Sequence, residues 1–261
     1  MMRIKPAVVA GLFYPDNPLL LRAELEGFFA VASPETVARP RALIVPHAGY
    51  RYSGPIAAQA YAALRPWASQ FEKVVVLAPS HRVAFRGIAT STAAAFQTPL
   101  GDIPVARDLV SKIEALPGVG QLDAAFAEEH ALEVQLPFLQ TVLPEFSLVP
   151  LIVGDADAQQ VSRVVDALQA DDTLIVVSSD LSHYEDYASC KAHDRRTSRS
   201  IEALQSDLIG PRDACGAFPL NGLLTVARQK GWQVETLDLR NSGDTGGDRL
   251  RVVGYGAYVL H

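Results

Sequence analysis

Three histidines follow three hydrophobic runs, each at the point where a buried strand would end. The pairs of run and histidine are Ala42–Val45 with His47, Val74–Ala78 with His81, and Thr173–Val177 with His183. Ligands of open α/β sheets collect beyond the carboxyl ends of the strands, and imidazole is the commonest metal ligand. A single strand-end histidine is more often structural. Three at equivalent positions indicate a metal or catalytic site at one edge of a sheet.

An aspartate and a cysteine could add to this chemistry. Asp180 and His183 form a D-x-x-H pair, which suits an acid/base pair or groups that support a metal ligand. Alternatively, Asp180 caps the helix that follows. Cys215 lies in a segment with Gly216 and Pro219 beside it, which suggests a shaped turn. The spacing leaves open whether Cys215 is a ligand or a small buried hydrophobic residue.

The remaining candidates have ordinary interpretations. His130 is expected to open a helix. His193 lies in a polar helical segment and is expected on the solvated surface. Cys190 lies in the middle of the same segment and is expected to be structural.

Hydrophobic runs alternate with helical segments along the chain. The predicted strands are 42–45, 74–78, 148–153, 173–177, 232–239 and 252–260. The predicted helices are 55–64 after a Ser53 cap, 128–142 interrupted at Pro137, 158–168, 187–204, and 221–230 ending at Gly231. Such alternation predicts βαβ units. We therefore expect one α/β domain over residues 1–261, with three α/β/α layers and a mostly parallel central sheet.

The bulk composition excludes several classes of protein. The chain of 261 residues is 49% hydrophobic and 20% charged, as in ordinary globular proteins. Its net charge of −6, without a basic stripe, argues against a nucleic-acid partner. No apolar stretch approaches the length of a membrane helix. Two cysteines and the absence of a signal-peptide pattern predict a cytoplasmic protein.

Several segments together resemble the Memo family, whose prokaryotic members are labelled AmmeMemoRadiSam system protein B. The resemblance spans nearly the whole chain, and its combination of motifs is specific. The matching segments are 10–15, 46–50, 52–54, 78–81, 129–137, 149–154, 178–184, 215–216, 241–248 and 253–257.

The resemblance implies a fold like that of the class III extradiol (LigB-like) dioxygenases, which hold Fe(II) with two histidines and a carboxylate. It implies His47, His81 and Cys215 as metal ligands and Asp180 and His183 as catalytic residues. His130, Tyr50 and Tyr184 are expected to bind substrate. Fe(II) is the expected cofactor, with copper or zinc as alternatives. A thiolate in place of the carboxylate makes the site softer, so ordinary ring cleavage does not follow.

Three functions fit these residues. The first is an O₂-dependent oxidoreductase acting on a small-molecule or peptide ligand. The second is a non-catalytic metal-binding accessory or adaptor module, with a radical SAM protein as a candidate partner. The third, a zinc metallohydrolase, has less support. The substrate, the native metal and the oligomeric state do not follow from the sequence.

Overall fold

A nine-stranded mixed sheet forms the centre of the fold. The computed structural model describes residues 3–33 and 38–261. The strand order is β10-β12-β2-β9-β3-β8-β4-β7, with β11 paired to β12. The strands are β2 (Ala42–Val45), β3 (Lys73–Pro79), β4 (Ile88–Thr90), β7 (Val119–Gln121), β8 (Ser147–Val153), β9 (Thr173–Ser178), β10 (His183–Glu185), β11 (Val234–Asn241) and β12 (Val252–Leu260).

The sheet is parallel only in part. β2, β9, β3 and β8 pair in parallel at its centre, as does β4 with β7. β12 runs antiparallel to β2, β10 and β11, and β4 runs antiparallel to β8. The expected parallel pairing is therefore confirmed for the central strands and for β4 with β7, but the sheet as a whole is mixed rather than mostly parallel. β2 and β9 are buried at every residue, and β3 and β8 at every residue but the first, as strands covered on both faces should be.

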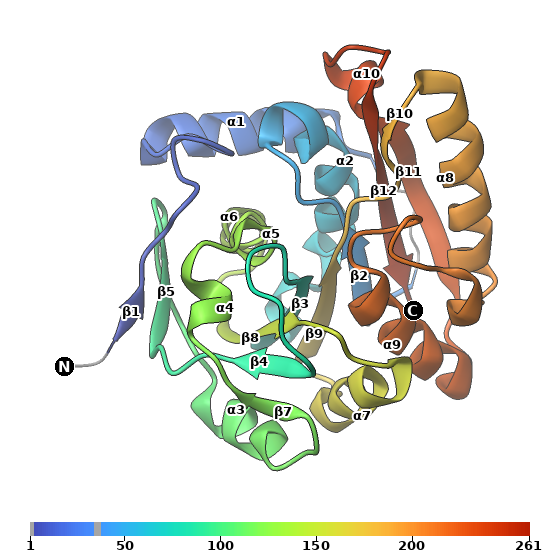
Figure 1. Ribbon diagram of the computed structural model, residues 1–261. Helices are drawn as coiled ribbons and strands as arrows, with labels where there is room; N and C mark the ends of the chain where they lie inside the picture. Colours follow the sequence, from blue (N-terminus) through green and yellow to red (C-terminus); the bar gives the residue numbers. More distant parts are fainter. Residues whose placement is uncertain (1–2, 34–37) are drawn as a thin grey trace.

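A smaller sheet lies beside the main one. β1 (Ile4–Lys5) pairs in parallel with β5 (Ala95–Thr98), and β5 pairs antiparallel with β6 (Gly101–Pro104). In Figure 1 this sheet stands at the N-terminal side of the molecule, next to α4 and α6.

Helices lie on both sides of the main sheet. α2 contacts β2, β11 and β12, α8 contacts β11 and β12, and α9 contacts β3 and β9. Figure 1 shows α2 and α8 on opposite sides of the β11–β12 pair. The α-helices are α1 (Pro18–Val31), α2 (Tyr50–Ala62), α3 (Arg107–Glu114), α4 (Ala124–Ala127), α5 (His130–Glu133), α6 (Leu136–Val142), α7 (Ala158–Leu168), α8 (Tyr187–Glu202), α9 (Ala217–Lys230) and α10 (Ser242–Thr245). Short 3₁₀ helices span Arg65–Gln70 and Ser206–Leu208.

The helix boundaries correct two sequence expectations. α2 begins at Tyr50 rather than at Pro55, with Gly49 as its N-cap. Ser53 lies inside the helix and donates to the Ala48 carbonyl, so it is not the cap. The expected helix over 128–142 is divided into α5 and α6, and Pro137 falls in the first turn of α6, where its missing N–H costs nothing.

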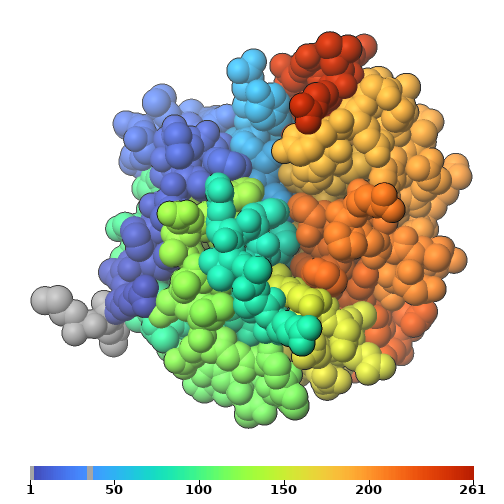
Figure 2. Space-filling view, viewed as in Figure 1, coloured from blue at the N-terminus to red at the C-terminus, as the bar shows by residue number. Residues whose placement is uncertain are grey.

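The chain folds so that distant segments share one surface. On the face seen in Figure 2, residues from the N-terminal part and from the C-terminal part lie on opposite sides, with the middle of the chain between them.

Among the described residues, no helix combines the length and apolarity needed to cross a membrane.

Close packing of α7 against α9 depends on one glycine. Gly222 is a buried residue of α9, and a Cβ atom there would stand 2.2 Å from Val161 Cγ1 of α7. In contrast, Gly27 is exposed within α1, and a Cβ atom there would have no neighbour within 4 Å. Both glycines are in helix interiors, but only Gly222 is required by packing.

We therefore expect opposite effects from the same substitution at these two glycines. Gly222→Ala forces two helices apart and should lower the free energy of unfolding by about 1–3 kcal/mol. Gly27→Ala should raise it by about 0.5–1 kcal/mol, because alanine loses less backbone entropy in a helix. Urea denaturation of both variants measures the difference. A Gly222→Ala protein as stable as the wild type would contradict the close packing.

Candidate metal centre

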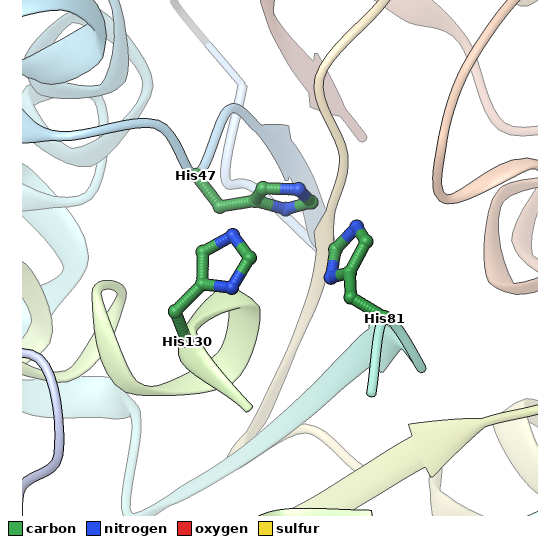
Figure 3. A group of neighbouring side chains, drawn as sticks. All are labelled: His47, His81 and His130. Atoms are coloured by element: carbon green, nitrogen blue, oxygen red, sulfur yellow. The ribbon is translucent and has the colours of Figure 1, made fainter. Parts of the chain in front are cut away.

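Three histidine side chains converge at the carboxyl edge of the central strands. One ring nitrogen from each of His47, His81 and His130 lies within 4.8 Å of the other two. The ring centroids are 4.8 to 5.4 Å apart, and Figure 3 shows the three rings facing a common space. His47 is buried, His130 is half-buried, and His81 is exposed. The group can hold a metal ion and is open on the side of His81.

Sheet topology explains the convergence. β9 lies between β2 and β3 and pairs in parallel with both. His47, Asp180 and His81 each stand two residues beyond the end of their strand. Parallel neighbours end at the same edge, so equal offsets bring the three residues together. His130 arrives separately, as the first residue of α5.

His47 is held by three contacts at the end of β2. Its backbone N–H donates to Asp180 Oδ1 over 2.7 Å. Its ring Nδ1 is 2.9 Å from Ser178 Oγ, and its ring Nε2 is 3.2 Å from Cys215 Sγ. The backbone N–H and both ring nitrogens of this buried histidine therefore have defined neighbours.

Glu129 holds His81 in place. The carboxylate accepts from the His81 backbone N–H over 2.7 Å, from His81 Nδ1 over 2.9 Å, and from the Ala131 N–H over 3.0 Å. Burial alone would raise the pKa of Glu129, but these hydrogen bonds outweigh it and hold the pKa at about 2. The ionised carboxylate keeps a proton on His81 Nδ1, which leaves Nε2 as the atom free to bind a metal.

Two of the imidazoles are held neutral. Burial, followed by the neighbouring His81, lowers the pKa of His47 to about 3. Burial, followed by the neighbouring His47, lowers the pKa of His130 to about 4. Neutral imidazole is the form that binds metals, so protons compete little at these two residues near pH 7.

His130 has a ring nitrogen without a partner. Its Nδ1 is buried and lacks a hydrogen bond, although Glu129 Oε1 lies 3.3 Å away. The ring packs against Phe13 with centroids 4.8 Å apart. Buried polar atoms are nearly always satisfied, so an unsatisfied imidazole nitrogen beside two other histidines suits a bound cation.

Cys215 reaches the site because Gly216 follows it. A Cβ atom on Gly216 would lie 2.7 Å from Ser179 Cβ, so only glycine lets this turn contact the end of β9. The turn is fixed there by Cys215 N donating to Asp180 O and by Gly216 N donating to Ser179 Oγ. Burial raises the pKa of the Cys215 thiol to about 12, so it is a protonated thiol near pH 7. Among the described residues it lies outside the three-histidine group but touches His47.

Asp180 and His183 lie near the histidine group without bonding each other. His183 Nδ1 donates to the Leu181 carbonyl over 2.8 Å, which leaves its Nε2 free. Asp180 is fully buried, and burial raises its pKa. Its alternative interpretation as a helix cap was wrong, because Asp186 caps α8. Asp180 instead supports the backbone of His47.

The two candidate tyrosines occupy different environments. Tyr50 is buried, and its hydroxyl donates to the Val134 carbonyl over 2.7 Å. Tyr184 is 65% exposed, has a positive φ of 62°, and stacks under the Arg251 guanidinium 5.1 Å from the ring centroid. Its ring lies 5.7 Å from that of His183. Only Tyr184 is open to a ligand through its hydroxyl, and substrate binding by either residue stays a prediction.

His193 corrects another expectation. It is not on the solvated surface: its side chain is 14% exposed and lies between two carboxylates. Nδ1 is 2.8 Å from Glu185 Oε1, and Nε2 is 2.7 Å from Asp213 Oδ1. It thereby ties α8 to the turn that carries Cys215. Cys190 is buried, and its thiol donates a hydrogen bond to Asp194 Oδ2, in keeping with a structural role.

The motif Glu129–Pro137 contains residues whose roles sequence reasoning missed. Glu129 orients His81, and His130 joins the possible ligands. Gln135 Nε2 donates to Ser178 Oγ over 2.8 Å, so it also contacts the site. The cluster of polar residues in an otherwise apolar motif was the available signal.

Stability should depend on pH through His193. Burial alone would lower its pKa, but the hydrogen bonds and charges of Asp213 and Glu185 raise it. The stabilisation is thus complete below the unfolded-state pKa of about 6.5 and is lost as the pH rises through the higher folded-state pKa. In urea denaturation, His193→Gln should be less stable than the wild type, with the difference in unfolding free energy narrowing as the pH rises above about 6.5. A gap that widens with pH would contradict the charged bridge.

Comparison with known proteins identifies relatives over the full length. The family model described as Memo-like protein matches residues 5–259. A MEMO1 family protein of Methanopyrus kandleri is 35% identical, covering 99% of each chain. A MEMO1 family protein of Aquifex aeolicus is 33% identical, covering 97% of this chain and 98% of its own. One of Thermotoga maritima is 32% identical, covering 99% and 100%.

A solved structure supports the fold alone. An uncharacterized protein of Escherichia coli K12 superposes with a TM-score of 0.54 at 13% identity, covering 85% of this chain and all of its own. The family model and the three relatives carry the assignment, because the model matches residues 5–259 and the relatives are 32% to 35% identical over almost the whole chain. On these matches, the chain belongs to the Memo-like protein family.

Proposed function

We propose that this protein binds one redox-active metal ion and uses it in O₂-dependent oxidation of a small substrate. Iron is the first candidate for this metal and copper the second. The observation that carries the proposal is the convergence of His47, His81 and His130 within 4.8 Å. Cys215 is proposed as an additional ligand, because its Sγ is 3.2 Å from His47 Nε2 and two atoms at that separation can share an ion.

The donor set fits such a metal. Neutral imidazoles and a thiolate suit Fe(II), Cu and Zn, whereas Mg²⁺ and Ca²⁺ prefer oxygen ligands. The unpartnered Nδ1 of His130 would gain a partner from a bound ion or from the ring reorientation that binding allows. The exposure of His81 leaves a side from which a substrate can approach.

A bound iron or copper ion would supply electron transfer and O₂ activation. The chain itself would position and move protons. His183, held by the Leu181 carbonyl through Nδ1, has Nε2 free to take a proton from a substrate or return one. Asp180 would keep His47 in position through the backbone N–H and would balance positive charge on His183 electrostatically. Tyr184, exposed beside His183, would contact the substrate.

A second function is favoured by the number of donors. Three imidazoles and one thiol make four, and four protein ligands on a tetrahedral ion leave no open position. A site filled in that way would belong to a non-catalytic accessory module, for which a radical SAM protein is the candidate partner. Zinc with an open position would instead make a metallohydrolase.

We also propose a three-layer fold, a single domain and a cytoplasmic location. A three-layer domain like that of the extradiol dioxygenases is supported by the helices on both sides of the sheet. One domain over residues 1–261 is supported by a hydrophobic cluster from Val9 to Leu260. A cytoplasmic location is supported by two free cysteines, Cys190 and Cys215.

Metal content tests the site first. Protein purified without oxygen should contain close to one iron or copper ion per chain by elemental analysis. His81→Ala and Cys215→Ser should each lose most of this metal. Cys190→Ser should keep it, because Cys190 is hydrogen-bonded to Ser182 and Asp194 rather than to a histidine of the group. Oxygen consumption that disappears with the metal supports the oxidoreductase. Full metal without any oxygen consumption favours the accessory module, and a wild type that takes up no metal rejects both.

Proton release tests whether the Cys215 thiol becomes a ligand. Its pKa of about 12 means that binding as thiolate must expel a proton. At about pH 8, where ordinary imidazole is neutral, we expect about one proton per Fe(II) bound and an affinity that rises about tenfold per pH unit. Cys215→Ser should abolish the release, as followed with a pH indicator in weak buffer. Release of no proton by the wild type would leave a site of histidines alone.

A further inference from the structure

We infer that Ser178, oriented by Gln135, is a positioning residue that keeps the ring proton of His47 on Nδ1 and so leaves the Nε2 lone pair free for a metal. The inference rests on the proposed metal site for its purpose. The position of the proton follows from the hydrogen bonds of the metal-free protein.

The single proton of the Ser178 hydroxyl is already used. Ser178 Oγ donates to the Ala131 carbonyl over 2.6 Å. Its oxygen can therefore only accept from its two other neighbours, Gln135 Nε2 at 2.8 Å and His47 Nδ1 at 2.9 Å. A hydroxyl has two lone pairs, so this arrangement fills it completely. His47 Nδ1 must carry the proton.

The direction of the Gln135 amide is also determined. Tyr61 has a hydroxyl that donates to Gln135 Oε1 over 2.9 Å, and Gln135 Nε2 donates to the Pro46 carbonyl over 2.9 Å. Exchanging the amide oxygen and nitrogen would place an oxygen against the Pro46 carbonyl. Gln135 therefore presents N–H groups to both Pro46 and Ser178, and Ser178 cannot turn its proton toward this side.

The opposite tautomer of His47 would leave two acceptors facing each other. With the proton on Nε2, the bare Nδ1 would stand 2.9 Å from a serine oxygen that has no proton to give. His47 and Ser178 are both buried, so water cannot compensate at this contact. With the proton on Nδ1, the Cys215 thiol can donate to Nε2 over 3.2 Å. A metal ion could then bind His47 Nε2 without removing a proton from the ring. It would only displace the hydrogen bond from the Cys215 thiol.

The proton position can be measured without a metal. Long-range ¹H–¹⁵N correlation spectra of the metal-free wild type should show His47 Nδ1 as a protonated nitrogen and Nε2 as an unprotonated one. Assignment uses the signals lost in His47→Ala. A protonated Nε2, or rapid exchange between the two tautomers, would overturn the inference whether or not the protein binds metals.

The role of Ser178 is tested with Co(II), whose visible absorbance reports its ligands. Ser178→Ala should mix the His47 tautomers and weaken Co(II) binding by roughly 10- to 100-fold, as expected when a partner of a ligand histidine is removed. Ser182→Ala is the matched control, since Ser182 is equally buried but bonds Cys190 rather than a histidine, and its affinity should be unchanged.

The outcomes separate the inference from the proposed function. Wild-type affinity in a folded Ser178→Ala protein overturns the positioning role, even if His81→Ala still loses the metal. Absence of Co(II) binding by the wild type overturns the proposed metal site, and the tautomer spectrum then still decides the proton position. Equal losses in Ser178→Ala and Ser182→Ala point to general destabilisation and also overturn the role.

Discussion

The parallel pairing of β9 with both β2 and β3 is the constraint on which the site depends. Hydrogen bonding between neighbouring parallel strands fixes where each strand ends relative to the next. Val45 is registered with Ser178, and Leu77 with Val177. Three chain segments therefore leave the sheet at one edge, and residues two positions further on meet there. A shift of one strand along its neighbours would separate His47 from Ser178 and Asp180 and leave buried polar groups without partners.

Several polar side chains are buried at that edge, and burying them without hydrogen bonds would cost free energy. Almost all of their polar atoms have hydrogen-bond partners. Asp180 accepts from the His47 backbone, Glu129 accepts three hydrogen bonds, and Ser178 has all its hydrogen-bonding capacity in use. These bonds are specific in direction, so they orient the histidine rings while they offset desolvation. The unpaired Nδ1 of His130 departs from this pattern within the group. A bound cation at the proposed metal site would account for this deficit in an otherwise satisfied network.

The sequence predicted the sheet edge but not everything that lies at it. The strands predicted from hydrophobic runs and from alternating segments were found near their expected positions, with β2 and β12 matching to the residue. β4 and β7 were missed because they have only three residues each and no periodic signal. The antiparallel pairing of β12 was missed because a hydrophobic run does not encode the direction in which a strand pairs with its neighbour. His130 was placed correctly at a helix start, but its approach to His47 depends on how α5 packs, which no local pattern encodes. His193 looks solvated in sequence because its two carboxylate partners are eight and twenty residues away.

The contacts of two carboxylates beside the histidines bear on how the proposed metal site would differ from a triad of two histidines and a carboxylate. Asp180 and Glu129 both lie beside the histidines, yet their oxygens already accept hydrogen bonds from His47, His81 and Ala131. Binding a metal through Glu129, or through Asp180 Oδ1, would compete with bonds that hold His47 and His81 in place. The donors that remain are imidazole nitrogens and the Cys215 sulfur, all softer than carboxylate oxygen. Hard ions such as Mg²⁺ would then find no suitable ligand, while iron, copper and zinc would. Selectivity for softer metal ions would then come from the hydrogen bonds that Asp180 and Glu129 accept, because these bonds make nearby carboxylate oxygens less available to an ion.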